Sequence, residues 1–270
     1  MQTIVLGHDE PIFCEQECQD SVRQKNGNTL PTFTLFSLDD VSLVRHIEGC
    51  VDRTHAKRIT VVARAHSYTP LFADMTKLTN QKRFGVTFLV VEEHPRESFT
   101  VLPHVLALMD VFVTLPCSLQ ELSQTLRELR DTTQHLACFI HDGIPQTTDR
   151  IPHVPFGSIP TVHAGGSCAV FATGFDIVRA EDMVSSLEKN DTLTTLLYVP
   201  TLNPFDRNAV ISAAKECGAC VVIEQEHCVG GLAQQIGETL SRYAPVPMEV
   251  SRNMTALPQT IKKVLQRKRK

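Results

Sequence analysis

Residues 168–199 read CAVFATGFDIVRAEDMVSSLEKNDTLTTLLYV, and this stretch decides the fold class of the chain. Its first part, 168–173, is an apolar run that predicts a buried strand ending before Gly174. The next part predicts a helix, because four apolar residues recur on one face: Ile177, Ala180, Val184 and Leu187. Residues 195–199 predict a second strand. A strand, an amphipathic helix and another strand in this order are typical of an α/β protein with a parallel sheet.

The same alternation continues toward the end of the chain. Asn203 followed by Pro204 predicts the start of a helix that runs to about Cys217, since Asn caps helices and Pro suits their first turn. Two more strands are predicted at 219–223 and 247–250, and a helix opens at Gly230-Gly231. A closing helix is predicted around 261–265. We therefore expect an open-sheet domain over residues 151–270.

The first half has the pattern in a less regular form. A helix is predicted just before its last strand, because Leu119, Leu122, Leu126 and Leu129 share a face. Residues 142–159 hold several Pro and Gly signals without apolar periodicity, which predicts a linker. The expected architecture is α/β, with two open-sheet three-layer domains at 1–150 and 151–270. Apolar, β-rich runs predict the strands of the first domain at 32–36, 58–63, 86–91, 111–115 and 136–140.

Composition excludes several classes of protein. A net charge of −4 argues against nucleic-acid binding through bulk positive charge. Without a long apolar stretch or a basic start followed by an apolar run, neither a membrane span nor a secretory signal is expected. Nine scattered cysteines do not form a disulfide pattern and indicate a reducing compartment, the cytoplasm. The basic cluster at the end, Lys262, Lys263 and Arg267 to Lys270, predicts a solvated, frayed helix terminus.

Three short motifs have both a structural and a functional interpretation. Cys217 and Cys220 have CxxC spacing, but a second pair for zinc is missing and small buried cysteines are the simpler interpretation. Gly230-Gly231 could receive an anion at a helix start, but close helix–strand packing is the simpler interpretation. His66 and His94 each follow a predicted strand, where open-sheet proteins bind ligands, although a solvated loop histidine is the alternative.

Three elements of the second half resemble the C-terminal domain of transketolase. Residues 172–175, ATGF, resemble the family's "ATG" strand end, and residues 199–206, VPTLNPFD, resemble its "MPTxKPFD" element. Glu226-His227, followed by GGL at 230–232, is similar to its "EEHxxxGGL" element. The β chain of 2-oxo-acid dehydrogenases and deoxyxylulose-phosphate synthase share much of this domain. The resemblance therefore indicates a superfamily more than a substrate.

The first half resembles, more distantly, the pyrimidine-binding domain of the same family. Glu15-Gln16 looks like the "EQ" of its "GIAEQN" motif, and residues 31–36, PTFTLF, are similar to its "PxxSTF" strand. His66 follows its strand as the family's "HAG/HDS" histidine does, and Pro116-Cys117 resembles its "PCD/PAD" strand end. The resemblance implies a divergent pyrimidine-binding domain at 1–150 and a transketolase C-terminal-like domain at 151–270.

This resemblance implies roles for four residues. Glu15 would be catalytic, its carboxyl group lying beside N1′ of the aminopyrimidine of thiamine diphosphate and promoting the imino tautomer. Phe36 would bind the cofactor by stacking on the pyrimidine ring. His66 and His141 would bind substrate, His141 standing where the family has an arginine for the substrate phosphate. No metal ligand is expected, and magnesium would come only through a partner.

The family's diphosphate-binding signature, GDG followed by Asn, is missing from the sequence. The resemblance then implies a separate diphosphate-binding chain that shares the cofactor, together with self-association as a dimer. The expected function is that of the C-terminal subunit of a split transketolase-like enzyme, which transfers a two-carbon ketol unit between sugar phosphates. Such a subunit would be inactive without its partner.

Departures from the family pattern favour an alternative. The segment 17–25 is charged where the family is small and apolar, the "GPTHQ" loop is missing, and His141 replaces an arginine. The alternative is a catalytically inactive transketolase-like chain that serves as a structural or regulatory subunit of a larger assembly. A third interpretation, a dehydrogenase β-like chain, would use the same glutamate on 2-oxo acids.

Overall fold

The computed structural model divides the chain into two compact units, Met1–Thr147 and Thr148–Lys270. Each is an α/β unit with a largely parallel sheet, which confirms the predicted fold class. The structure describes residues 4–6, 12–15, 22–24, 33–36, 43–65, 68–92, 98–108, 110–141, 143–148, 150–152, 155–188, 192–225 and 228–268.

The sheet of the first unit has its longest strands at the centre. Strands β5 (Arg58–Arg64) and β6 (Gly85–Glu92) are buried along their whole length, as the strands of a sheet covered on both faces must be. The unit's strands follow the order β7-β8-β6-β5-β2-β4, and every pair among them is parallel. The other strands are β2 (Ile12–Glu15), β4 (Phe33–Phe36), β7 (Val111–Thr114) and β8 (His135–His141). A separate parallel pair joins β1 (Ile4–Leu6) and β3 (Val22–Gln24).

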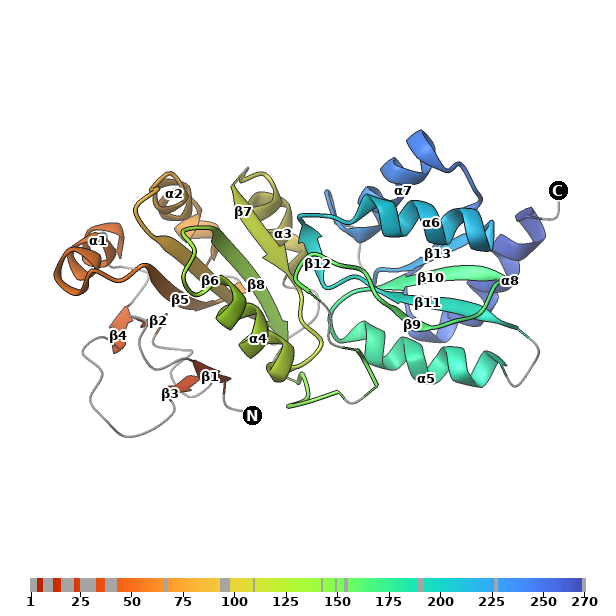
Figure 1. Cartoon of the computed structure of the whole chain (residues 1–270), viewed down its shortest axis with the longest axis horizontal. Helices are drawn as coiled ribbons and strands as arrows, with labels where there is room; N and C mark the ends of the chain where they lie inside the picture. The colour runs from red at the N-terminus through yellow and green to blue at the C-terminus, as the bar shows by residue number, and fades with distance from the viewer. Residues whose placement is uncertain are drawn as a thin grey trace. The chain divides into compact units, whose positions relative to one another are not determined.

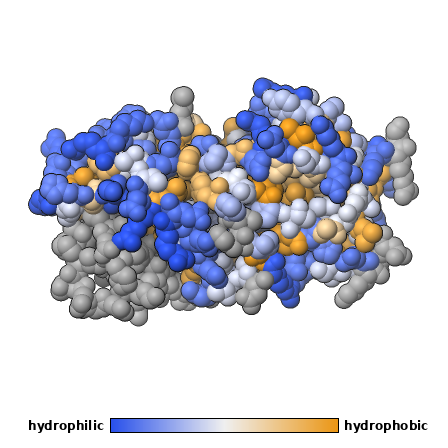
Figure 2. Space-filling view, in the orientation of Figure 1, coloured by the Kyte–Doolittle hydropathy of each residue, from blue (hydrophilic) through white to orange (hydrophobic). Residues whose placement is uncertain are grey.

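Helices cover both faces of this sheet. α1 (Leu43–Thr54), α2 (Tyr68–Thr79) and α3 (Ser98–Leu106) pack in succession along one face, and α4 (Leu119–Leu129) lies on the other (Figure 1). The change of face follows from right-handed crossovers, because the path to β7 skips β8 and the chain then reverses through α4. Over α1 the surface is mostly hydrophilic (Figure 2), as its exposed residues Arg45, His46 and Asp52 require.

The second unit has the strand order β14-β13-β10-β11-β9. Strands β14, β13, β10 and β11 are parallel to one another, and β9 pairs antiparallel with β11 at the edge of the sheet. Helix α5 covers one face of this sheet, and α6 and α7 pack together on the other (Figure 1). The strands are β9 (Thr161–His163), β10 (Cys168–Ala172), β11 (Thr194–Tyr198), β12 (Thr201–Asn203), β13 (Cys220–Ile223) and β14 (Met248–Ser251). The helices are α5 (Asp176–Glu188), α6 (Arg207–Cys217), α7 (Leu232–Tyr243) and α8 (Leu257–Lys268), with a 3-10 turn, η3 (Met254–Ala256), before α8.

The predicted start of α6 is wrong. Asn203 ends the short strand β12, and the helix begins only at Arg207. Its cap is Asp206, whose Oδ1 accepts a hydrogen bond from the Ala209 N–H at 3.0 Å. The capping chemistry is therefore present, but a later residue supplies it because Asn203 remains in extended backbone.

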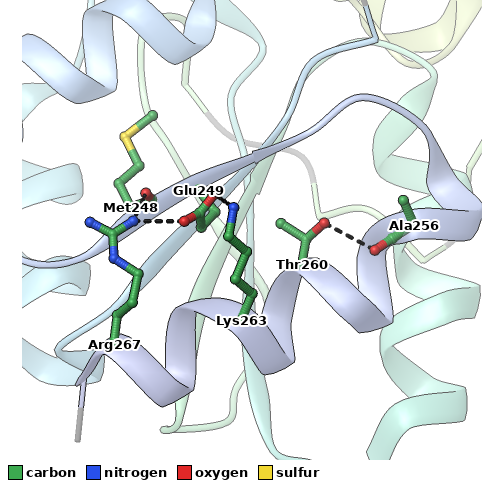
Figure 3. Close-up of polar contacts among 6 residues, drawn as sticks. All are labelled: Met248, Glu249, Ala256, Thr260, Lys263 and Arg267. Atoms are coloured by element: carbon green, nitrogen blue, oxygen red, sulfur yellow. Dashed lines mark hydrogen bonds and ion pairs between the residues drawn. The ribbon is translucent and has the colours of Figure 1, made fainter. Parts of the chain in front are cut away.

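The basic terminus is solvated as predicted, with Lys262, Lys263 and Arg267 exposed, but over the described residues it is not frayed, since α8 continues to Lys268. The Glu249 carboxylate of β14 receives Lys263 Nζ at 2.9 Å and Arg267 Nη1 at 2.6 Å (Figure 3). Lys268 Nζ donates to the Cys217 carbonyl at the end of α6, at 2.6 Å. Lys263 and Arg267 thus connect the last helix to β14, and Lys268 connects it to the end of α6.

Candidate functional site

Three of the four sequence-predicted site residues, Glu15, Phe36 and His141, end strands at the carboxyl edge of the first sheet. Because its strands are parallel, their last residues meet at one edge, the usual ligand-binding edge of an open α/β sheet. Taken along the sheet from β7 to β4, these last residues are Thr114, His141, Glu92, Arg64, Glu15 and Phe36.

Glu15 and Phe36 lie side by side on the backbone. β2 pairs with β4 in parallel, and in this register Glu15 is the partner of Phe36. Both residues end their strands, so the chain brings a carboxylate and an aromatic residue to neighbouring positions of the edge.

His66 lies outside the described residues. The strand before it, β5, is the other neighbour of β2 and ends at Arg64. The described backbone thus brings the end of β5 to the strand that carries Glu15.

His141 ends β8 at the same edge and is half-buried. Its Nδ1 accepts a hydrogen bond from the Gly143 N–H at 2.9 Å. A backbone amide only donates, so Nδ1 carries a lone pair and the proton of the neutral ring sits on Nε2.

Two charged residues of the edge escaped the sequence analysis. Glu92 and Arg64 end β6 and β5, and each exposes only 6% of its surface. Glu92 is the register partner of His141, so a carboxylate and an imidazole stand next to each other on adjacent strands. The sequence could have identified both residues, because each directly follows a predicted apolar strand, and the carboxyl ends of parallel strands meet at one edge of the sheet.

The nearby N-terminus of α4 is occupied by the chain itself. The Leu119 and Gln120 amides donate to the carbonyls of Pro145 and Gln146, both at 3.0 Å. Ser118 caps the helix by accepting from the Glu121 N–H at 3.2 Å. These three amides are therefore committed to chain contacts.

In the second unit, Gly230-Gly231 serves packing, as the simpler interpretation predicts. A Cβ on Gly231 would lie 2.5 Å from Glu224 Oε1. This buried carboxylate accepts a hydrogen bond from the Ala233 N–H of α7 at 3.1 Å and lies 3.6 Å from Arg252 Nη1. An internal carboxylate thus takes the position at the start of α7 that an anionic ligand would take.

The CxxC pair is buried, which confirms the interpretation as small core cysteines. Cys217 and Cys220 are fully buried free thiols, with Cys168 and Cys228 also buried in the same unit. Burial raises the pKa of Cys220 and of Cys228 to about 12. Thiols held protonated in this way are poor nucleophiles and poor metal ligands. Among the described residues, no three His, Cys, Asp or Glu side chains converge as a metal site, and no helix could cross a bilayer.

Known proteins resemble this chain mainly in the second unit. The family model "Transketolase, C-terminal domain" matches residues 157–266. A 1-deoxy-D-xylulose-5-phosphate synthase from Thermomicrobium roseum is 29% identical over 100 residues, which cover 37% of this chain and 16% of that protein. The 6-deoxy-6-sulfo-D-fructose transketolase subunit SqwH from Clostridium sp. (strain MSTE9) is 32% identical over 92 residues, covering 34% and 29%. The matches thus span less than a third of these curated relatives.

The fold similarity extends over nearly the whole chain. A solved structure described as a split gene transketolase, inactive beta4 tetramer, aligns with a TM-score of 0.68 at 14% identity. The alignment covers 94% of this chain and 92% of that one. At this low identity the alignment shows a shared fold alone. Because the alignment covers nearly the whole chain, that shared fold includes the first unit.

Proposed function

We propose that the chain, whose residues 157–266 match the transketolase C-terminal domain model, is the C-terminal subunit of a split transketolase-like enzyme. In this proposal it shares thiamine diphosphate with a separate diphosphate-binding chain and moves a two-carbon ketol unit between sugar phosphates. Relatives that are themselves transketolase subunits support it, as does the fold similarity to a split transketolase.

The observation that carries the proposal is the register of Glu15 with Phe36 at the carboxyl edge. A carboxylate and an aromatic residue on adjacent strand ends fit the aminopyrimidine of thiamine diphosphate, which offers a basic ring nitrogen and a flat face. When bound, this cofactor supplies the electron sink for breaking a carbon–carbon bond beside a carbonyl group. The first unit would then be a divergent pyrimidine-binding domain, with magnesium and the diphosphate held by the partner.

The roles of the chain's own residues follow from their chemistry. Glu15 would hold and return a proton at the pyrimidine ring nitrogen, and Phe36 would stack on the ring. His141, at the end of β8, would bind the substrate from the same edge of the sheet. His66, following β5, would bind the substrate from the neighbouring strand. The free thiols of the second unit support a reducing compartment such as the cytoplasm.

A second candidate function is that of a catalytically inactive structural or regulatory subunit. The observation that favours it is the pairing of His141 with the buried Glu92 on adjacent strands. A carboxylate beside an imidazole repels phosphate, whereas a guanidinium grips it with two parallel hydrogen bonds.

The test is to isolate the protein gently from its source cells, measure its native mass and identify its partners by mass spectrometry. The proposal expects a complex with a chain bearing the GDG diphosphate signature, and ketol transfer by that complex. A complex that contains such a chain but transfers no ketol unit would establish the inactive alternative. A dimer of this chain alone would contradict the shared-cofactor proposal.

A further inference from the structure

His135 is held in one protonation state at the amino edge of the first sheet. It is the first residue of β8 and exposes 2% of its surface. The Val86 N–H of β6 donates to Nδ1 at 3.1 Å, and Nε2 lies 3.1 Å from the Gln81 carbonyl oxygen. An amide N–H only donates and a carbonyl only accepts, so these contacts require a lone pair on Nδ1 and a proton on Nε2. The fold therefore binds the neutral ring.

Charged groups surround this ring from three other parts of the unit. Arg58 of β5 is buried, and its guanidinium donates to Thr87 Oγ1 at 2.8 Å and to the Leu129 carbonyl at 2.9 Å. Lys82, after α2, forms an ion pair of 2.6 Å with Asp110, before β7. Burial lowers the pKa of His135, with Lys82 and Arg58 acting in the same direction, against the Gln81 hydrogen bond and Asp110.

We propose that His135 is an acid-sensitive latch between β6 and β8. A second proton, placed on Nδ1, would face the Val86 N–H across 3.1 Å and break that hydrogen bond. The charged ring would also lie buried beside Arg58. The hydrogen-bond partners of its two nitrogens are backbone groups and not a carboxylate that could balance the charge. Acid therefore opens the amino ends of the two strands, whose other ends are Glu92 and His141.

The sign of the effect follows from proton linkage. The unfolded chain binds a proton at His135 near pH 6.5, whereas the folded chain binds it only at lower pH. The contribution of the neutral His135 ring to the free energy of unfolding is fully present above about pH 6.5. Below that, the ratio of folded to unfolded protein falls by up to about tenfold per pH unit until the folded pKa is reached.

The test measures the hydrogen-exchange protection factor of the Val86 amide in the full chain at pH 7.5 and 5.5. Wild type should lose several-fold more protection on acidification than His135→Gln, whose side chain does not titrate. His46→Gln, at an exposed position on α1, is the matched control and should behave as wild type. Equal loss of protection in wild type and His135→Gln would overturn the proposal.

A second measurement keeps the test valid if His135→Gln fails to fold. In wild type, ring-nitrogen NMR shifts report the tautomer and titration of each histidine directly. We expect His135 to carry its proton on Nε2 at pH 7.5 and to titrate below the ordinary histidine value of about 6.5. A proton on Nδ1, or titration at or above about pH 6.5, would contradict the latch.

Discussion

Glu15 and Phe36 are register partners at the carboxyl ends of the neighbouring parallel strands β2 and β4. The chain thus brings together two residues that lie in separate segments of the sequence, at the edge where open sheets bind ligands. This relationship is the basis of the proposed cofactor position.

Glu15→Gln should abolish ketol transfer by the complex of this chain with its partner. The amide keeps the size of the side chain but cannot exchange a proton, and losing such a group typically lowers the rate by about 100-fold or more. The check is the initial rate of the reconstituted complex. Glu128→Gln, at an exposed position on α4, is the control and should retain the wild-type rate. Undiminished activity of Glu15→Gln would remove the catalytic role.

Gly231→Ala should destabilise the second unit by about 1–3 kcal/mol, because the new methyl group would lie 2.5 Å from Glu224 Oε1. The free energy of unfolding in urea measures the effect. Gly166→Ala is the matched control, since nothing lies within 4 Å of its Cβ position and its stability should change little. Equal stability of the two variants would show that Gly231 is not needed for packing around Glu224.

The contact of α8 with β14 should weaken in acid. Hydrogen bonds from Lys263 and Arg267 lower the pKa of the Glu249 carboxyl group. Its contribution to stability is therefore present above the unfolded pKa, near 4.5, and is lost as the pH falls through the lower folded value.

We expect Glu249→Gln to cost about 0.5–1 kcal/mol at neutral pH, since both cations are largely exposed. Urea unfolding at pH 7 and pH 3.5 measures the difference, which should shrink in acid. A cost that stays the same at both pH values would mean that charge does not hold the contact.

The buried thiols of the second unit should resist alkylation in the native protein. Cys217 and Cys220 are fully buried, and burial raises the pKa of each. Iodoacetamide labelling at pH 7.5, quantified for each cysteine by mass spectrometry, should follow the urea unfolding transition. Rapid labelling of either thiol without urea would point to a reactive site instead.

The sequence predicted the second unit well because its strands are continuous apolar runs. The predicted runs 168–173 and 195–199 agree with β10 and β11 to within a residue at each end. The start of α6 was predicted wrongly because a local Asn-Pro signal was outweighed by strand β12, and Asp206 supplies the cap. Strand β9 was missed since its residues are partly exposed and it pairs only at an edge.

The candidate site could be predicted only in part. Glu15 and Phe36 were identified through a resemblance, but their register depends on β2 lying between β5 and β4, which no local pattern encodes. Glu92 was overlooked because it is a single acidic residue after an apolar run. Its pairing with His141 requires β6 and β8 to be neighbours although β7 intervenes in the sequence.

Thiamine diphosphate binding by the assembled complex tests the central claim most directly. Calorimetric titration, with magnesium present, should be carried out on this chain alone, on its partner alone and on their complex. The account predicts tight binding of one cofactor per copy of this chain in the complex, and markedly weaker binding by each chain alone. A partner that binds the cofactor equally well without this chain, or a complex that binds none, would contradict it.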